Sequence, residues 1–169
     1  MYKNLHEIFE EFEQRKTKSD KIAVLRYNGN YALRTILQGA FNPNVKFAIE
    51  VPDYKPSDSP IGMGYTHLIE ACHKLYLFEE GNPRAPKELT NERRKQLLIQ
   101  ILESLESKEA SLLQGMFRKK LPVKGLTYAI VKEAFPDLML QLRKIVCYGF
   151  EFSIEKSLTT NYLLCLKYI

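Results

Sequence analysis

The stretch that decides the fold is NERRKQLLIQILESLESKEASLLQGMF, residues 91–117. Its apolar residues recur three and four positions apart, as they do on the buried side of an amphipathic helix. The spacing predicts two successive helices, the first capped by Thr90 or Asn91 and the second opened by Ser107. The side chains expected to face the core are Leu97, Leu98, Ile101, Leu102 and Leu105, then Leu112, Leu113, Met116 and Phe117.

The same periodicity predicts three short helices nearer the N-terminus. The first runs to about Arg15, and the second, which we expect Ser19 to cap, ends at the turn signal of residues 28–30. The third ends at residues 42–43, because the residue before a proline is pushed out of the helical region. The apolar stripes are Leu5, Ile8, Phe9 and Phe12, then Ile22 and Leu25, then Leu33, Ile36, Leu37, Ala40 and Phe41.

The remaining segments complete an all-α pattern. Residues 44–64 contain three prolines and predict an ordered extended loop, in which Val45 to Val51 alternates partly, as a short strand does. One helix is predicted over residues 65–78, and a last one between the turn at residues 122–125 and Pro136. We therefore expect about seven helices packed as a bundle of antiparallel neighbours.

The domain organisation follows from where this pattern stops. Residues 1–140 are predicted to form the helical domain, and residues 141–169 a C-terminal extension. The extension is rich in Tyr, Phe, Leu and Ile and carries few turn signals. A β-hairpin, a helix packed on the bundle and a tail ordered by a partner all remain compatible with it.

Positive charge is concentrated in one part of the chain. The net charge is +5, and residues 111–144 contain seven basic against two acidic side chains, which is also +5. A basic face of this kind attracts phosphate backbones at long range, although many soluble proteins carry one without binding nucleic acid.

Composition also bounds the compartment and the redox chemistry. The N-terminus reads as an acidic amphipathic helix, so no signal peptide is expected, and no apolar run approaches the roughly 20 residues that cross a bilayer. We expect a cytoplasmic protein, in the host cytoplasm if it is viral, with no membrane partner. The three cysteines are far apart and predict neither a disulfide framework nor a zinc site, and we interpret Cys72 as a core residue.

No complete catalytic motif is present, so we expect no enzyme, no cofactor and no metal site. Phosphate-loop, dinucleotide-binding, nucleophile-elbow and H-E-x-x-H motifs are all missing from the sequence. His67 and His73 are six residues apart, which places them on different sides of a helix. Glutamates crowd the first helix, and Glu103, Glu106 and Glu109 follow at a spacing of three. We interpret both rows as solvated faces.

The most informative polar feature is the run Arg118-Lys119-Lys120 followed by Lys124. It lies around the turn at residues 122–125, just before the last helix, so its cations and the N–H groups nearby are suited to binding a phosphate. Thr127 is expected to add a hydroxyl contact. The alternative is an ordinary solvated turn whose cations oppose the dipole of the preceding helix.

These segments together resemble a known family. The stretch LIEACHKLYLFEEGNPRAPKELTNERRKQLLIQILESLESKEASLLQGMFRKKLPVKGLTYAIVKEAFPDL, residues 68–138, is similar to the N-terminal helical DNA-binding domain of ATP-dependent DNA ligases of tailed bacteriophages. The likeness lies in the order of its helices and in the closing segment AIVKEAFPDL, residues 129–138, with its Ile130, Lys132, Pro136 and Leu138. With AFNPNVKF at residues 40–47 it extends over about 5–138, as in small phage proteins that share this domain without a ligase core.

The resemblance implies an α-helical module that grips duplex DNA by its backbone. Arg118, Lys119, Lys120 and Lys124 would lie in the matching turn, and the region presented to phosphates would extend to Lys132. A ligase also requires a K-x-D-G lysine followed by nucleotidyltransferase and OB-fold domains, and the chain has neither the motif nor the length. Ligase activity is therefore not implied.

Two functional hypotheses follow. In the first, the chain is a non-catalytic module that binds DNA largely without regard to sequence, in replication or repair. In the second, it is an interaction adaptor that keeps the fold and docks on a replication or transcription partner through the apolar segment 148–169, since exposed apolar patches mark partner sites. The sequence does not indicate an oligomeric state.

Overall fold

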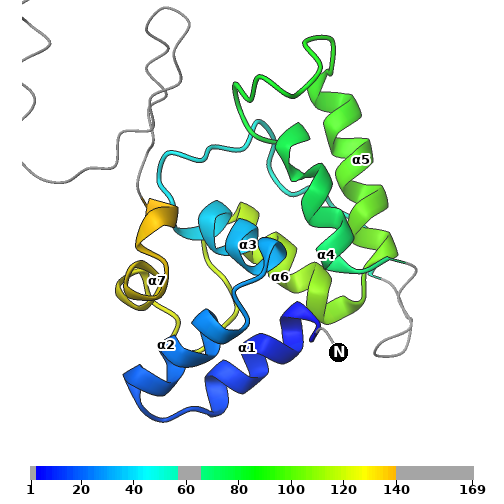
Figure 1. Cartoon of the computed structure of the whole chain (residues 1–169). Helices are drawn as coiled ribbons and strands as arrows, with labels where there is room; N and C mark the ends of the chain where they lie inside the picture. Colours follow the sequence, from blue (N-terminus) through cyan, green and yellow to red (C-terminus); the bar gives the residue numbers. More distant parts are fainter. Residues whose placement is uncertain (1–2, 57–65, 140–169) are drawn as a thin grey trace, which may run out of the picture. The chain divides into compact units, whose positions relative to one another are not determined.

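The computed structural model describes residues 3–56 and 66–139, and in these ranges the chain is all-α, as predicted (Figure 1). Seven α-helices and two short 3₁₀ helices occur there. Their bounds are α1 Leu5–Gln14, α2 Lys18–Tyr27, α3 Tyr31–Phe41, α4 Leu68–Ala71, η1 Cys72–Leu77, α5 Asn91–Ser104, α6 Ser107–Phe117, α7 Tyr128–Ala134 and η2 Pro136–Met139.

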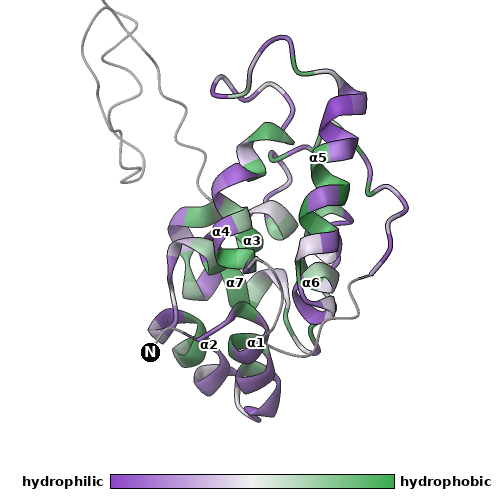
Figure 2. Cartoon of the chain, turned by 90° about the vertical axis from the view of Figure 1, so that its right-hand side faces the viewer, coloured by the Kyte–Doolittle hydropathy of each residue, from purple (hydrophilic) through white to green (hydrophobic). Residues whose placement is uncertain are grey.

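Helix α3 lies at the centre of this unit. It packs against α6 most extensively, and also against α4, η1, α7 and η2. Helices α1 and α2 form a pair below it in Figure 1, while α4 lies to its right and α5 lies above and to the right. The hydropathy stripe predicted for α5 is visible in Figure 2 as alternating green and purple bands. Its inward residues Leu98, Leu102 and Leu105 are fully buried.

Side-chain caps fix where four of the helices begin. The side chains of Thr17, Asn30, Thr90 and Thr127 each accept a hydrogen bond from the backbone N–H three residues ahead. Such a cap satisfies one of the N–H groups that the first turn leaves unpaired. The predicted cap Ser19 was wrong, because Thr17 caps α2 and Ser19 lies inside it. Of the two candidates for α5, Thr90 is the cap.

The helix predicted over residues 65–78 is shorter and changes type. Residue 65 lies outside the described residues, α4 has only four residues, and the chain continues as a 3₁₀ helix over Cys72–Leu77. Cys72, Leu75 and Phe78 are all buried and lie three positions apart. A 3₁₀ helix has three residues per turn, so it keeps such positions on one side.

The described part of the extended loop forms one β-bridge but no strand. Phe47 and Glu79 form an isolated antiparallel bridge, and no strand is present in the described part of the loop, residues 44–56. The bridge fixes the Phe47 ring against Phe117, with their centroids 4.3 Å apart. The loop thereby contacts the C-terminal end of α6, where the predicted basic run begins.

Contacts divide the chain into Met1–Met139 and Leu140–Ile169. The predicted extension, residues 141–169, lies outside the described residues. Within residues 3–56 and 66–139, no helix has the length and apolarity needed to cross a bilayer.

Candidate nucleic-acid interface

The basic run begins in a turn that ends α6. The N–H of Lys120 donates to the carbonyl of Gly115 at 2.8 Å, and the N–H of Lys119 donates to Met116 at 3.1 Å. This pair of bonds is the Schellman arrangement, in which the residue after the cap adopts the left-handed conformation. Here that residue is Lys119, with φ 58°, where glycine is usual. Arg118 precedes it as the C-cap of α6.

The Lys119 side chain is turned toward the protein, although the residue as a whole is exposed. Its Nζ donates to the carbonyls of Gly39, Asn42 and Val45, at 2.5, 3.3 and 2.6 Å. It also lies 4.9 Å from the centre of the Phe47 ring. Two of these carbonyls belong to the C-terminal end of α3, where backbone oxygens lack helical partners. Lys119 therefore joins the ends of α3 and α6, so its ammonium is engaged within the protein.

The electrostatics of Lys119 agree with this position. Burial lowers the pKa of its ammonium group below the ordinary lysine value, and the charge of Glu79 acts in the opposite direction. The three carbonyl acceptors offset part of the cost of removing the charge from water. A phosphate would have to compete with these contacts.

The other predicted cations are available at the surface. Arg118, Lys120, Lys124 and Lys132 are exposed. In the described part of the chain, none of their side chains lies within 4.0 Å of a carboxylate oxygen. Four cations that follow one another along the segment from α6 to α7 thus have no internal counter-ion there.

The turn at residues 122–125 contacts helices α1 and α2. The N–H of Lys124 donates to Glu13 Oε1 at 2.6 Å. Gly125 has φ 76°, and a Cβ built on it would lie 2.5 Å from Lys21 Nζ. The left-handed backbone favours glycine here, whereas the Lys21 ammonium is at the end of a flexible side chain that can move aside. Lys21 of α2, for which nothing in the sequence indicated a role, is thus brought next to Gly125.

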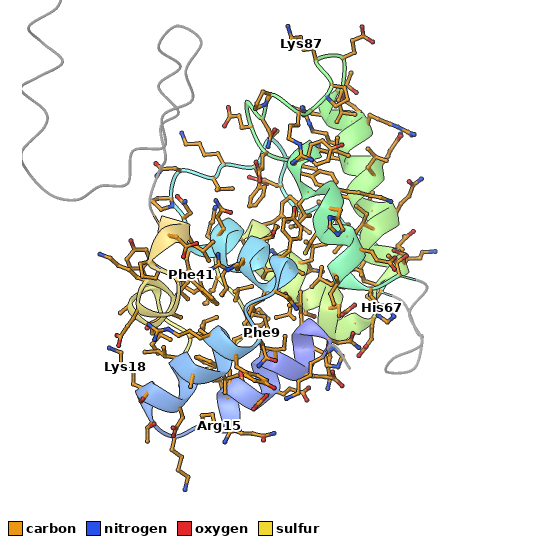
Figure 3. The ribbon with its side chains drawn as sticks, viewed as in Figure 1. Phe9, Arg15, Lys18, Phe41, His67 and Lys87 are labelled. Atoms are coloured by element: carbon orange, nitrogen blue, oxygen red, sulfur yellow. The ribbon has the colours of Figure 1, made fainter. Side chains whose placement is uncertain are left out.

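Thr127 is used to begin α7. Its hydroxyl oxygen accepts from the N–H of Ile130 at 3.5 Å. Two cations of α2 hold the other end of this helix: Lys18, labelled in Figure 3, pairs with the Glu133 carboxylate at 2.6 Å, and Arg26 donates to the Glu133 carbonyl at 2.8 Å. Lys18 and Arg26 therefore position α7, which carries the exposed Lys132.

A second polar cluster corrects one sequence prediction. Glu106 and Glu109 were interpreted as part of a solvated face, but they are 4% and 1% exposed. The reason is a break after Ser104 that ends α5, so Glu106 caps α6 and Glu109 lies in its first turn. Glu109 Oε2 accepts from the N–H of Leu68 at 2.9 Å. Its Oε1, and Nδ1 of the buried His6, have no hydrogen-bond partner in the described part of the chain.

Replacing Glu109 with glutamine is expected to raise the free energy of unfolding at pH 7 by roughly 1 kcal/mol. Burial raises the pKa of Glu109 above its ordinary 4.5, and Leu68, His67 and His6 only partly oppose this effect. The folded state thus holds the proton more tightly than the unfolded chain, and stability falls as pH rises from about 4.5 through the folded pKa. The glutamine keeps an acceptor for Leu68 and removes that dependence.

Urea unfolding at several pH values between 4 and 8 measures this effect. The matched control is Glu88→Gln, in the exposed loop before α5, which should leave the pH dependence as in the parent. A Glu109→Gln protein with an unchanged pH dependence would contradict the prediction.

Cys72 is buried, as interpreted from its place in the apolar stripe. Burial raises the pKa of its thiol to about 12, and the charge of Glu109 adds to the shift. A thiol with this pKa stays protonated at neutral pH, which is typical of an inert core cysteine.

The described residues form a small all-α domain with a buried apolar core. A run of exposed cations lies on the segment from the end of α6 to α7. The sequence profile of a family of unknown function, DUF6433, matches residues 8–122. The chain belongs to this family. The matched range begins inside α1 and ends at the turn after α6, and α7 follows it. A search of curated proteins found no match.

Proposed function

We propose that the chain is a non-catalytic module that binds duplex DNA through its phosphate backbone, in replication or repair. The observation that carries the proposal is that Arg118, Lys120, Lys124 and Lys132 are exposed on one segment, without a carboxylate partner in the described residues. Surface cations that are not neutralised internally are the groups that exchange counterions for DNA phosphates. Such contacts position a protein on DNA without reading sequence.

The resemblance of residues 68–138 to the DNA-binding domain of phage-type ligases supports the same proposal. The all-α architecture is compatible with that likeness. The site differs from the expectation in one respect: Lys119 contacts backbone carbonyls, so the proposed interface uses its neighbours and Lys132 instead. The adaptor hypothesis depends on residues 148–169, which lie outside the described residues, and it stays a prediction.

The deciding experiment is a fluorescence-anisotropy titration of nicked, intact and single-stranded DNA at several salt concentrations. We expect micromolar binding to duplexes, with an affinity that falls steeply as salt rises. Each phosphate contact should contribute about −0.9 to the slope of log K against log salt, so four contacts predict a slope near −3.6. The absence of binding at low salt would overturn the proposal.

A further inference from the structure

Glu13 makes an unusual contact for a surface carboxylate. Its neighbours on α1 are neutralised by side chains: Glu10 pairs with Lys108 at 2.6 Å, and Glu11 pairs with Lys3 and Arg15. Glu13 has no cation within 4.0 Å in the described residues. Instead, its Oε1 accepts from the backbone N–H of Lys124 at 2.6 Å.

The carboxylate thus lies at the turn that the sequence analysis assigned to a phosphate. Lys124 supplies the backbone donor, and the ammonium of Lys21 lies on the Gly125 side of the same turn. The Phe12 ring, 5.0 Å from Lys21 Nζ, holds this ammonium in place by a cation–π contact. A backbone N–H beside a lysine ammonium is a combination that binds phosphate oxygens.

We propose that Glu13 occupies the place of a DNA phosphate and must be displaced when DNA binds. The site revealed by its displacement consists of the Lys124 N–H and the Lys21 ammonium. This inference rests on the proposed function and adds to it a residue that binds, Lys21, and a residue that restrains binding, Glu13. The carboxylate repels an approaching phosphate and also occupies the donor that the phosphate would use.

The position of Glu13 makes the contact exchangeable. Glu13 lies in the last turn of α1, at the negative end of the helix dipole, where a carboxylate is disfavoured. The residue is exposed, so water solvates the carboxylate once it leaves the turn. A DNA phosphodiester carries the same single negative charge as the carboxylate, but its binding also releases counterions from the DNA, which favours exchange at low salt.

The test is the Glu13→Gln variant of the full chain, titrated against a fluorescein-labelled intact duplex. The amide keeps the shape and an acceptor for Lys124, but it removes the charge. We expect the variant to bind about fivefold more tightly than the parent. One charge that repels the phosphate is removed, and the Lys124 N–H is easier to free from a neutral amide than from a carboxylate.

The control separates this effect from a change in net charge. Asp20→Asn removes one negative charge from α2 next to Lys21, and the Asp20 side chain contacts no described N–H or cation. It should change the affinity by less than about twofold. In a Lys21→Gln background, the gain from Glu13→Gln should shrink to less than about twofold, because residues that share a site are not additive.

The outcomes distinguish the two proposals. If the parent binds DNA and Glu13→Gln binds no tighter than Asp20→Asn, the inference about Glu13 is wrong while the proposed function stands. If only the Glu13→Gln protein binds, the restraint by Glu13 stands, but the proposed function of the parent chain is overturned. If no variant binds although circular dichroism shows each to be helical, both proposals are overturned.

Discussion

Replacing Arg118, Lys120, Lys124 and Lys132 together with glutamine is expected to weaken duplex binding roughly a hundredfold. These side chains are exposed and are not neutralised by described carboxylates, so they contribute little to folding and are free to contact phosphates. The salt slope should fall by up to about 3.6, because four phosphate contacts are lost. Anisotropy titrations at several salt concentrations measure both quantities, and urea unfolding should show parental stability within about 0.5 kcal/mol.

A second quadruple variant tests whether position or total charge matters. It neutralises one arginine and three lysines that are exposed around η1 and the start of α5, above α3 in Figure 1. The substituted residues are Lys74, Lys87, Arg93 and Lys95. We expect this variant to lose less than about fivefold in affinity, through long-range attraction alone. Equal losses in the two variants would show that the segment from α6 to α7 is not the interface.

Lys119→Met is expected to lower the free energy of unfolding by about 2 kcal/mol. Methionine keeps the length of the side chain and the same left-handed backbone, so the change removes the ammonium alone. The carbonyls of Gly39, Asn42 and Val45 then lose a charged donor, and Phe47 loses its cation. Urea denaturation followed by circular dichroism measures the difference.

The neighbouring residue provides the control. Lys120→Met changes an exposed lysine whose Nζ donates to no described group, so stability should change by less than about 0.5 kcal/mol. The DNA affinities of the two variants should show the reverse order. Lys120→Met should bind DNA more weakly than the parent, whereas folded Lys119→Met should bind nearly as the parent does. If both variants unfold at the same urea concentration, the internal role assigned to Lys119 is wrong.

The contrast between these two lysines shows what the sequence could and could not predict. Lys119 and Lys120 are adjacent lysines of one basic run, so the sequence gives no reason to treat them differently. They are distinguished only by the end of α3, some 80 residues away in the chain, which Lys119 contacts. Lys21 was missed for the same reason, since nothing local connects it to Gly125. Glu109 was misread because one break between α5 and α6 turns an apparent helical row into a buried pair.

The fold was easier to predict from the sequence than the site, because helices are specified by residues that are close together in the chain. Apolar spacing located the seven α-helices of the described residues, and capping residues placed most of their boundaries within a few positions. The helix predicted over 65–78 was wrong in type, because the spacing of three between Cys72, Leu75 and Phe78 fits both α and 3₁₀ geometry. The cap of α2 was misplaced because Thr17 and Ser19 are both good capping residues.

The left-handed backbone at Lys119 places two demands on one position. Glycine would adopt φ 58° without the roughly 1 kcal/mol that a side chain costs there, but it has no group to reach the end of α3. No residue type satisfies the local and the distant requirement together. The position is thus locally frustrated, and its unfavourable conformation is maintained by contacts that exist only once the whole bundle has assembled.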